Sequence, residues 1–130
     1  MKVFDDSGKL IAIFQKHSEI LDNKNFLTDN FQEFQFGTFF LKAGEEIKRH
    51  IHKSQERLIF GTPEAIVVLE GSLEIHLYDN DKSYIKKIKL VSKDSILILG
   101  GGHSIKILKD CKFIEFKQGP YSAVEDKEHF

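Results

Sequence analysis

The stretch that decides the fold is residues 64–78, EAIVVLEGSLEIHLY. After Gly71, apolar residues stand at every second position, and before it residues 65–69 form a continuous apolar run. Period-two alternation predicts a half-buried strand, and a short apolar run is typical of a buried one. We therefore predict two strands, residues 64–69 and 72–78, joined by a tight turn at Glu70 and Gly71.

Further short strands are predicted on both sides of this stretch. Residues 3–4 and 10–14 flank the turn-rich residues 5–8 and predict a hairpin. The other predicted strands are residues 35–41, 47–52, 57–60, 84–90, 95–99, 103–108 and 113–117. Residues 17–34 have a looser pattern, which predicts a covering segment with a short helical turn at residues 28–31. So many short strands at near-regular spacing predict an all-β sandwich or small barrel.

Composition narrows the classes of protein and of partner. The 130 residues (15.0 kDa) are the size of one domain, so we expect residues 1–130 to form a single domain. Lys and Arg number 19 and Asp and Glu number 20, a balance that argues against nucleic acid and anionic membranes as partners. The single cysteine, Cys111, cannot form an intrachain disulfide, and no apolar leader or membrane span is visible. We expect a cytoplasmic protein.

Four side chains form a candidate metal site. His50 and His52 lie two apart on a predicted strand, so both point to the same face. Glu64 and His103 each begin a predicted buried strand, in phase with its core residues. Burying ionisable groups is costly unless they are paired or bind a metal, and three imidazoles with one carboxylate suit a divalent transition metal. The alternative is a set of surface histidines and a solvated glutamate.

The spacing of these residues resembles the first motif of the cupin superfamily. Five residues separate Gly44 from His50-Ile51-His52, and six residues separate Glu64 from Gly71. The resemblance covers roughly residues 36–117. It implies an all-β double-stranded β-helix (a cupin or jelly-roll barrel), with the first residues as an N-terminal hairpin and covering segment.

The second cupin motif ends in a glycine-containing turn and a histidine, which residues 100–103 (GGGH) resemble. Two positions depart from it, because Lys93 stands where a glycine is usual and Ile98 where a proline is usual. The resemblance implies that His103 is the fourth metal ligand.

The carboxylate ligand has two candidates. Eleven residues separate His52 from Glu64, whereas three or four are usual in cupins. Glu56 has the shorter spacing, but Pro63 then occupies the expected glycine position. We favour Glu64, with residues 53–63 as an inserted excursion, and Glu56 is the alternative.

The resemblance implies one divalent metal ion (Fe, Mn, Ni or Zn) with open positions for water or substrate. Such an ion acts as a Lewis acid or generates a hydroxide nucleophile. We expect a small metalloenzyme of the isomerase or epimerase type, acting on a sugar or similar polar small molecule. Lys48 and Arg57 are candidates for binding an anionic substrate, or are simply solvated. A non-catalytic ligand sensor and a metal-dependent dioxygenase are the alternatives, because no further acid or base is visible beyond the ligands.

The segment KQGPY at residues 117–121 is similar to a subgroup of small cupins that accompany surface-polysaccharide and sugar-nucleotide enzymes. This similarity implies a bacterial protein of sugar metabolism. An apolar hairpin appended to a small barrel commonly pairs with a second subunit, so we expect a homodimer.

Overall fold

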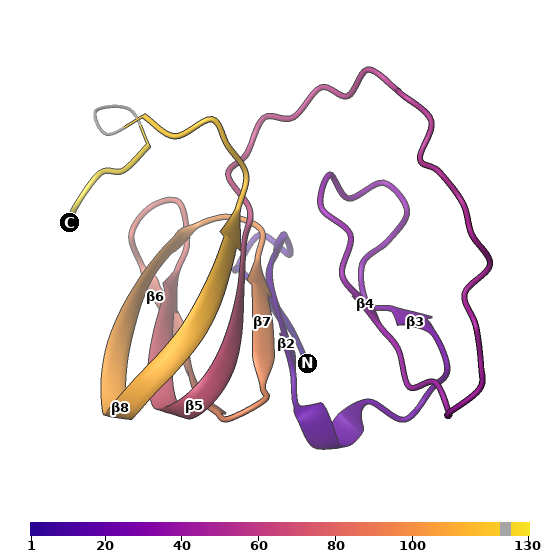
Figure 1. Ribbon diagram of the computed structural model, residues 1–130. Coiled ribbons are helices and arrows are strands. Elements are labelled where there is room, and N and C mark those ends of the chain that lie inside the picture. Colours follow the sequence, from indigo (N-terminus) through magenta and orange to yellow (C-terminus); the bar gives the residue numbers. More distant parts are fainter. Residues whose placement is uncertain (123–125) are drawn as a thin grey trace. The chain divides into compact units, whose positions relative to one another are not determined.

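The computed structural model describes residues 1–122 and 126–130 (Figure 1). The chain divides into two compact units, described here one at a time. Unit 1 consists of Met1–Glu19 and Gly61–Phe130, and unit 2 of Ile20–Phe60. The expectation of one domain over residues 1–130 stays a prediction.

Unit 1 contains a six-stranded antiparallel sheet. Its strands are β1 (Lys2–Phe4), β2 (Leu10–Gln15), β5 (Glu64–Tyr78), β6 (Tyr84–Val91), β7 (Ser95–Ile98) and β8 (Gly102–Lys117). The order is β1-β2-β7-β5-β6, and β8 pairs with β5. The predicted hairpin of β1 and β2 is confirmed, with Val3 opposite Ala12.

β5 is one long strand, so the predicted turn at Glu70 and Gly71 is wrong. The β5–β8 pairing shifts register at three points between Val68 and Leu73, and Gly71 has φ +77°. A Cβ on Gly71 would lie 1.9 Å from the carbonyl oxygen of Asp110. The glycine therefore makes a bulge that bends the strand without ending it, because it permits both the positive φ and the close approach of β8.

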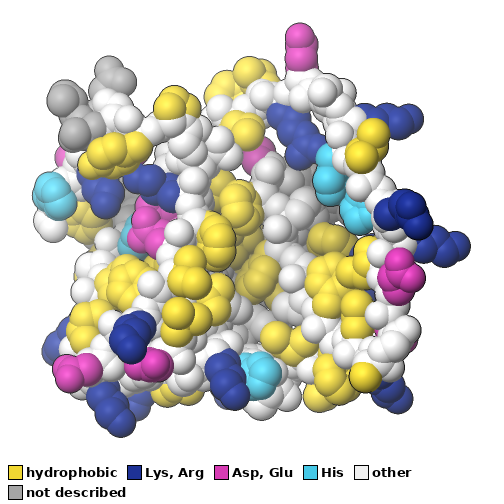
Figure 2. Space-filling view, viewed as in Figure 1, with side chains coloured by type: hydrophobic (Ala, Val, Ile, Leu, Met, Phe, Trp, Pro, Cys, Tyr) yellow, Lys and Arg dark blue, Asp and Glu magenta, His cyan; other side chains and the backbone are white. Residues whose placement is uncertain are grey.

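β8 likewise joins two predicted strands, residues 103–108 and 113–117, into one. Among the described residues β8 is hydrogen-bonded to β5 alone, so its other edge has no strand beside it. Large apolar side chains on β8 are exposed: Ile107, Leu108, Phe113, Ile114 and Phe116. Figure 2 shows hydrophobic side chains gathered over this strand. A long edge strand of this kind is a template for further pairing.

The core of unit 1 is a cluster of buried apolar side chains from β1, β2, β5, β6 and β7. It consists of Val3, Ile11, Ala12, Phe14, Ile66, Val68, Leu73, Ile75, Leu77, Ile88, Leu90, Ile96 and Ile98. The alternating residues after Gly71 point inward as predicted, since Leu73, Ile75 and Leu77 are fully buried. Burial of this apolar area is the main stabilising contribution to the sheet.

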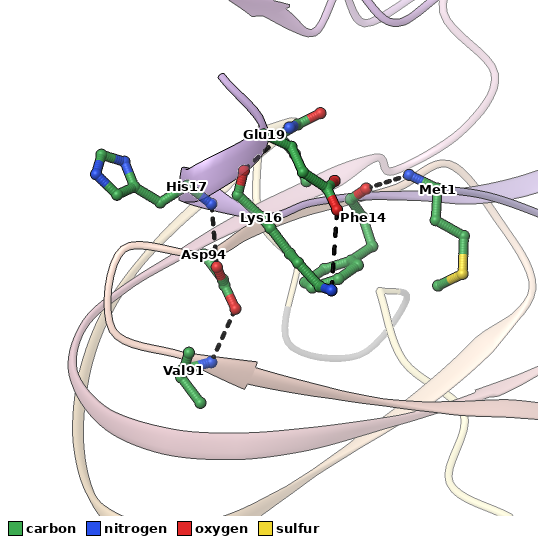
Figure 3. A network of polar contacts seen from close by, with 8 residues as sticks. Met1, Phe14, Lys16, His17, Glu19, Val91 and Asp94 are labelled. Carbon is green, nitrogen blue, oxygen red and sulfur yellow. Dashed lines mark hydrogen bonds and ion pairs between the residues drawn. The ribbon is translucent and has the colours of Figure 1, made fainter. Parts of the chain in front are cut away.

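The turn between β6 and β7 is held by the buried carboxylate of Asp94 (Figure 3). Its Oδ1 accepts a hydrogen bond from the His17 amide at 3.1 Å, and its Oδ2 accepts one from the Val91 amide at 3.2 Å. The neighbouring Lys93 has φ +74°, a conformation that favours glycine. Asp94 thereby ties the turn to the 3₁₀ turn η1 (His17–Glu19).

Unit 2 has only a short two-stranded sheet among its described residues, β3 (Asn25–Phe26) and β4 (Gly37–Thr38). The strands predicted at residues 47–52 and 57–60 are wrong, and of residues 35–41 only β4 is a strand. The helical turn predicted at residues 28–31 is a single turn, closed by the Gln32 amide on the Asp29 carbonyl at 3.0 Å. A period-two pattern indicates an extended backbone, whereas a strand also needs a hydrogen-bonded neighbour.

The all-β class is therefore confirmed. Neither of the described sheets closes into a barrel. Across the described residues we find no helix with the length and apolar character needed to cross a bilayer.

Candidate functional site

Glu64 and His103 meet in unit 1. Glu64 begins β5 and His103 follows the first residue of β8. His103 Nε2 donates a hydrogen bond to Glu64 Oε2 at 3.0 Å, since a carboxylate can only accept. The Glu64 side chain is 8% exposed and that of His103 is 26% exposed. The two residues are thus a largely buried pair with one partner open to solvent.

The pair forms because the sheet curls. Along the β5–β8 ladder Glu64 is opposite Lys117 and His103 is opposite Leu77, so the two residues stand at opposite ends of the ladder. Glu64 is also opposite Ile98, the last residue of β7, and only a short loop separates Ile98 from His103. The bend at Gly71 and this loop together bring the two ends of the ladder into contact.

The hydrogen bond from His103 holds the pKa of Glu64 below its usual value near 4.5. Burial acts in the opposite direction but is outweighed, and the positive charges of Lys117 and Lys127 lower the pKa further. Glu64 is therefore a carboxylate at neutral pH, able to accept hydrogen bonds or to ligate a cation.

Both residues line a cavity of about 510 Å³. Its other lining residues all belong to unit 1 and come from the β1–β2 turn, the start of β5, the β5–β6 turn, the loop after β7, the end of β8 and the segment 126–130. They include Gly100, Gly101 and Gly102, which lead into His103. The charged groups are of both signs, with Lys9, Lys117, Lys127, Asp126 and Glu128 on the wall. This mixture suits a polar ligand better than an apolar one.

A second ion pair lies on the cavity wall. Lys117 Nζ is 3.2 Å from Asp126 Oδ2, and the two side chains are 16% and 15% exposed. Lys117 Nζ also lies 4.4 Å from the centre of the Tyr121 ring. The backbone amide of Ser122 donates to Asp126 Oδ1 at 3.2 Å. Lys117 and Asp126 thus present a fixed cation and a fixed carboxylate to the cavity.

His50 and His52 lie in unit 2, on an exposed stretch of extended chain. Their ring centres are 5.2 Å apart in an edge-to-face arrangement, although the strand predicted here is absent. His50 Nδ1 donates to the Lys48 carbonyl oxygen at 2.9 Å, because a carbonyl can only accept. That bond leaves the Nε2 lone pair of His50 free for a metal, the arrangement usual for metal-binding histidines.

The other predicted residues are also in unit 2. Lys48 and Glu56 are exposed. Arg57 lines a hollow of about 290 Å³ with residues 30–33 and its neighbours Leu58 and Ile59. Their roles in binding substrate or metal stay predictions. Of the two carboxylate candidates, Glu64 is the buried one.

The donors therefore occur as two pairs, Glu64 with His103 and His50 with His52. Among the described residues, no three His, Cys, Asp or Glu side chains gather closely enough to hold a metal ion. The chemistry of the donors fits a divalent transition metal, since each pair has an imidazole or carboxylate with a free electron pair.

Two charged residues of the cavity were missed by the sequence reasoning. Lys117 is in phase with Phe113, which is itself exposed, so the alternation on β8 gives no signal that Lys117 lines a cavity. Asp126 lies in a segment without periodicity, and nothing in its sequence signals that it folds against a strand.

No protein-family model, no curated protein and no solved structure matches this chain. The cupin resemblance therefore depends on the motif residues alone.

Proposed function

We propose that this chain is a cupin-like protein that binds one divalent transition metal through His50, His52, Glu64 and His103. The observation that carries the proposal is the contact between Glu64 and His103 at 3.0 Å. These residues are far apart in sequence, and the cupin motifs name both as ligands. Their position on the wall of a polar cavity supports a site that is open to a small molecule.

The finer fold that we propose is a jelly-roll barrel, in which the sheet continues beyond β8. The free edge of β8 and its exposed apolar side chains support this, because a neighbouring strand would satisfy the edge and cover the side chains.

The activity that we propose is isomerisation or epimerisation of a sugar or similar polar metabolite. A bound metal would supply Lewis acidity toward a carbonyl oxygen. Lys117, Lys127 and His129 are among the groups outside the ligand set that line the cavity, and they could bind the substrate or move a proton on it. Lys48 and Arg57 would bind an anionic part of it.

Elemental analysis of the purified chain tests the metal proposal. We expect about one transition metal ion per chain, a large loss in Glu64→Ala, and unchanged content in the matched variant Glu56→Ala. Occupancy should also fall as the pH drops through about 6, because histidine binds metal only when neutral. If only Glu56→Ala loses metal, Glu56 and not Glu64 is the carboxylate ligand. A wild-type protein without metal would refute the proposal.

Two alternatives make different predictions for the loaded protein. A ligand sensor would bind a small molecule tightly without turnover. A dioxygenase would consume oxygen with a redox-active metal. Product analysis with a panel of sugars, together with an oxygen electrode, separates the three functions.

A further inference from the structure

Residues 126–130, here called the strap, fold back over the cavity that contains Glu64 and His103. The strap is the yellow end of the chain in Figure 1. All five of its residues line that cavity. Glu128, His129 and Phe130 also line an adjoining cavity of about 350 Å³, together with His103, Ser104, Tyr78 and Lys82. The strap therefore forms part of the wall of two cavities, and His103 lines both of them.

The ring of Phe130 rests on β8 and β5. Its centre is 5.3 Å from that of Tyr78, in an edge-to-face arrangement. Gly102 makes room for it, because a Cβ on Gly102 would lie 2.7 Å from Phe130 Cζ. Lys82 Nζ lies over the ring, 5.6 Å from its centre. A residue with any side chain at position 102 would displace the ring.

Two ion pairs hold the rest of the strap. Asp126 binds Lys117 at 3.2 Å, and Glu128 binds Lys82 at 2.7 Å. The second pair is exposed, with Glu128 at 78%, and exposed pairs contribute little to stability. Phe130 itself remains 62% exposed. The outer half of the strap is therefore held by weak contacts, which is typical of segments that open locally.

We propose that the strap is a movable cover that controls access to His103, with the Phe130 ring as its latch and Gly102 as the position that receives the latch. The Lys117–Asp126 pair is its fixed end. Opening increases the exposure of His103, whose side chain is 26% exposed with the strap in place, and joins the two adjoining cavities. The proposal depends on the proposed function in one respect, that the cavity is the ligand site, but the movement itself can be measured without metal or ligand.

The test measures the modification rate of His103 by diethyl pyrocarbonate in metal-free protein, with each histidine followed by peptide mass mapping. Phe130→Ala removes the latch. Gly102→Ala keeps the Phe130 ring but puts a methyl group into the space that the ring occupies. We expect both to increase the His103 rate about fivefold, the factor that corresponds to the loss of one aromatic pair. His17, at a distance from the strap in sequence and exposed in the same unit, should react at an unchanged rate and serves as internal reference.

Gly100→Ala is the matched control. Gly100 is two residues away, and a Cβ there would meet nothing nearer than Lys9 Nζ at 3.9 Å. An unchanged His103 rate in this control, with the two increases, supports the strap. Unchanged rates in both test variants, or an equal increase in Gly100→Ala, would overturn it. Because this readout uses no metal, a failed strap and a failed metal site give separate results.

Discussion

Glu64 illustrates how one buried carboxylate can be supported by a single partner. A charged group without a partner would be strongly destabilising in the interior, and the imidazole of His103 offsets that cost by donating to Oε2 at 3.0 Å. The same bond lowers the pKa of Glu64, so the charged form is the one that folding favours.

Glu64→Gln should therefore change the pH dependence of stability. Because the pKa of Glu64 is lowered in the folded state, its contribution is present above about pH 4.5 and is lost as the pH falls through the lowered value. We expect the variant to be less stable by about 1 kcal/mol at pH 7 and the difference to disappear in acid. Urea unfolding of both proteins across this pH range measures it. Glu56→Gln should stay within about 0.5 kcal/mol of the wild type at every pH, and an equal effect there would contradict the prediction.

Lys93 is a residue in a conformation that suits glycine, with φ +74°. Lys93→Gly should raise the free energy of unfolding by about 0.5–1 kcal/mol, because relief of the left-handed strain exceeds the extra entropy of glycine in the unfolded chain. Thermal unfolding monitored by circular dichroism tests this. Lys89→Gly, in the middle of β6, should have the opposite sign, and a loss of stability in both variants would refute the explanation.

At the scale of elements, the bend in β5 positions the site. Residues 64–69 and 72–78 were both predicted as strands, and both are strands. The sequence pattern could not distinguish a turn at Gly71 from a bulge, because both require a positive φ. The pairing with β8 distinguishes the two. β8 is hydrogen-bonded to both halves of β5, so the chain continues through Gly71 as a bulged strand instead of reversing.

Gly71→Ala should therefore be strongly destabilising, by at least about 3 kcal/mol, because the methyl group would meet the Asp110 carbonyl at 1.9 Å in addition to the positive φ. Gly8→Ala is the matched variant, since Gly8 has φ +83° with nothing within 4 Å. The free energy of unfolding of Gly8→Ala should fall by only about 1 kcal/mol. Chemical denaturation compares the two, and similar losses would show that the close approach of β8 is unimportant.

At the scale of the whole molecule, the hydrogen bonding of the free edge of β8 tests whether the sheet closes into the proposed barrel. If the sheet continues beyond β8, amides on both sides of this strand are hydrogen-bonded and should exchange slowly. Hydrogen exchange followed by NMR measures each amide of residues 102–117. We expect uniform protection that does not change on dilution. Alternating fast and slow amides would contradict the barrel, and protection lost on dilution would instead indicate that β8 pairs with a second copy of the chain.

The sequence by itself determined the all-β class, the hairpin of β1 and β2, the inward face of β5 and the burial of Glu64. Each of these depends on local periodicity or on a turn residue, which a single segment carries in its own side chains. The strands predicted at residues 47–52 and 57–60 were wrong because a strand must pair with a neighbouring strand. The local pattern of a segment does not say whether such a neighbour is present.

Only the tertiary structure decided that Glu64 meets His103, that Lys117 pairs with Asp126 and that Phe130 occupies the space left by Gly102. The first contact joins residues that are distant in sequence, and it arises because a bulged strand curls the sheet on itself. The other two arise because residues 126–130 fold against β5 and β8. The physical reason is that periodicity specifies which face of a strand is buried, whereas curvature and loop closure specify which buried groups touch.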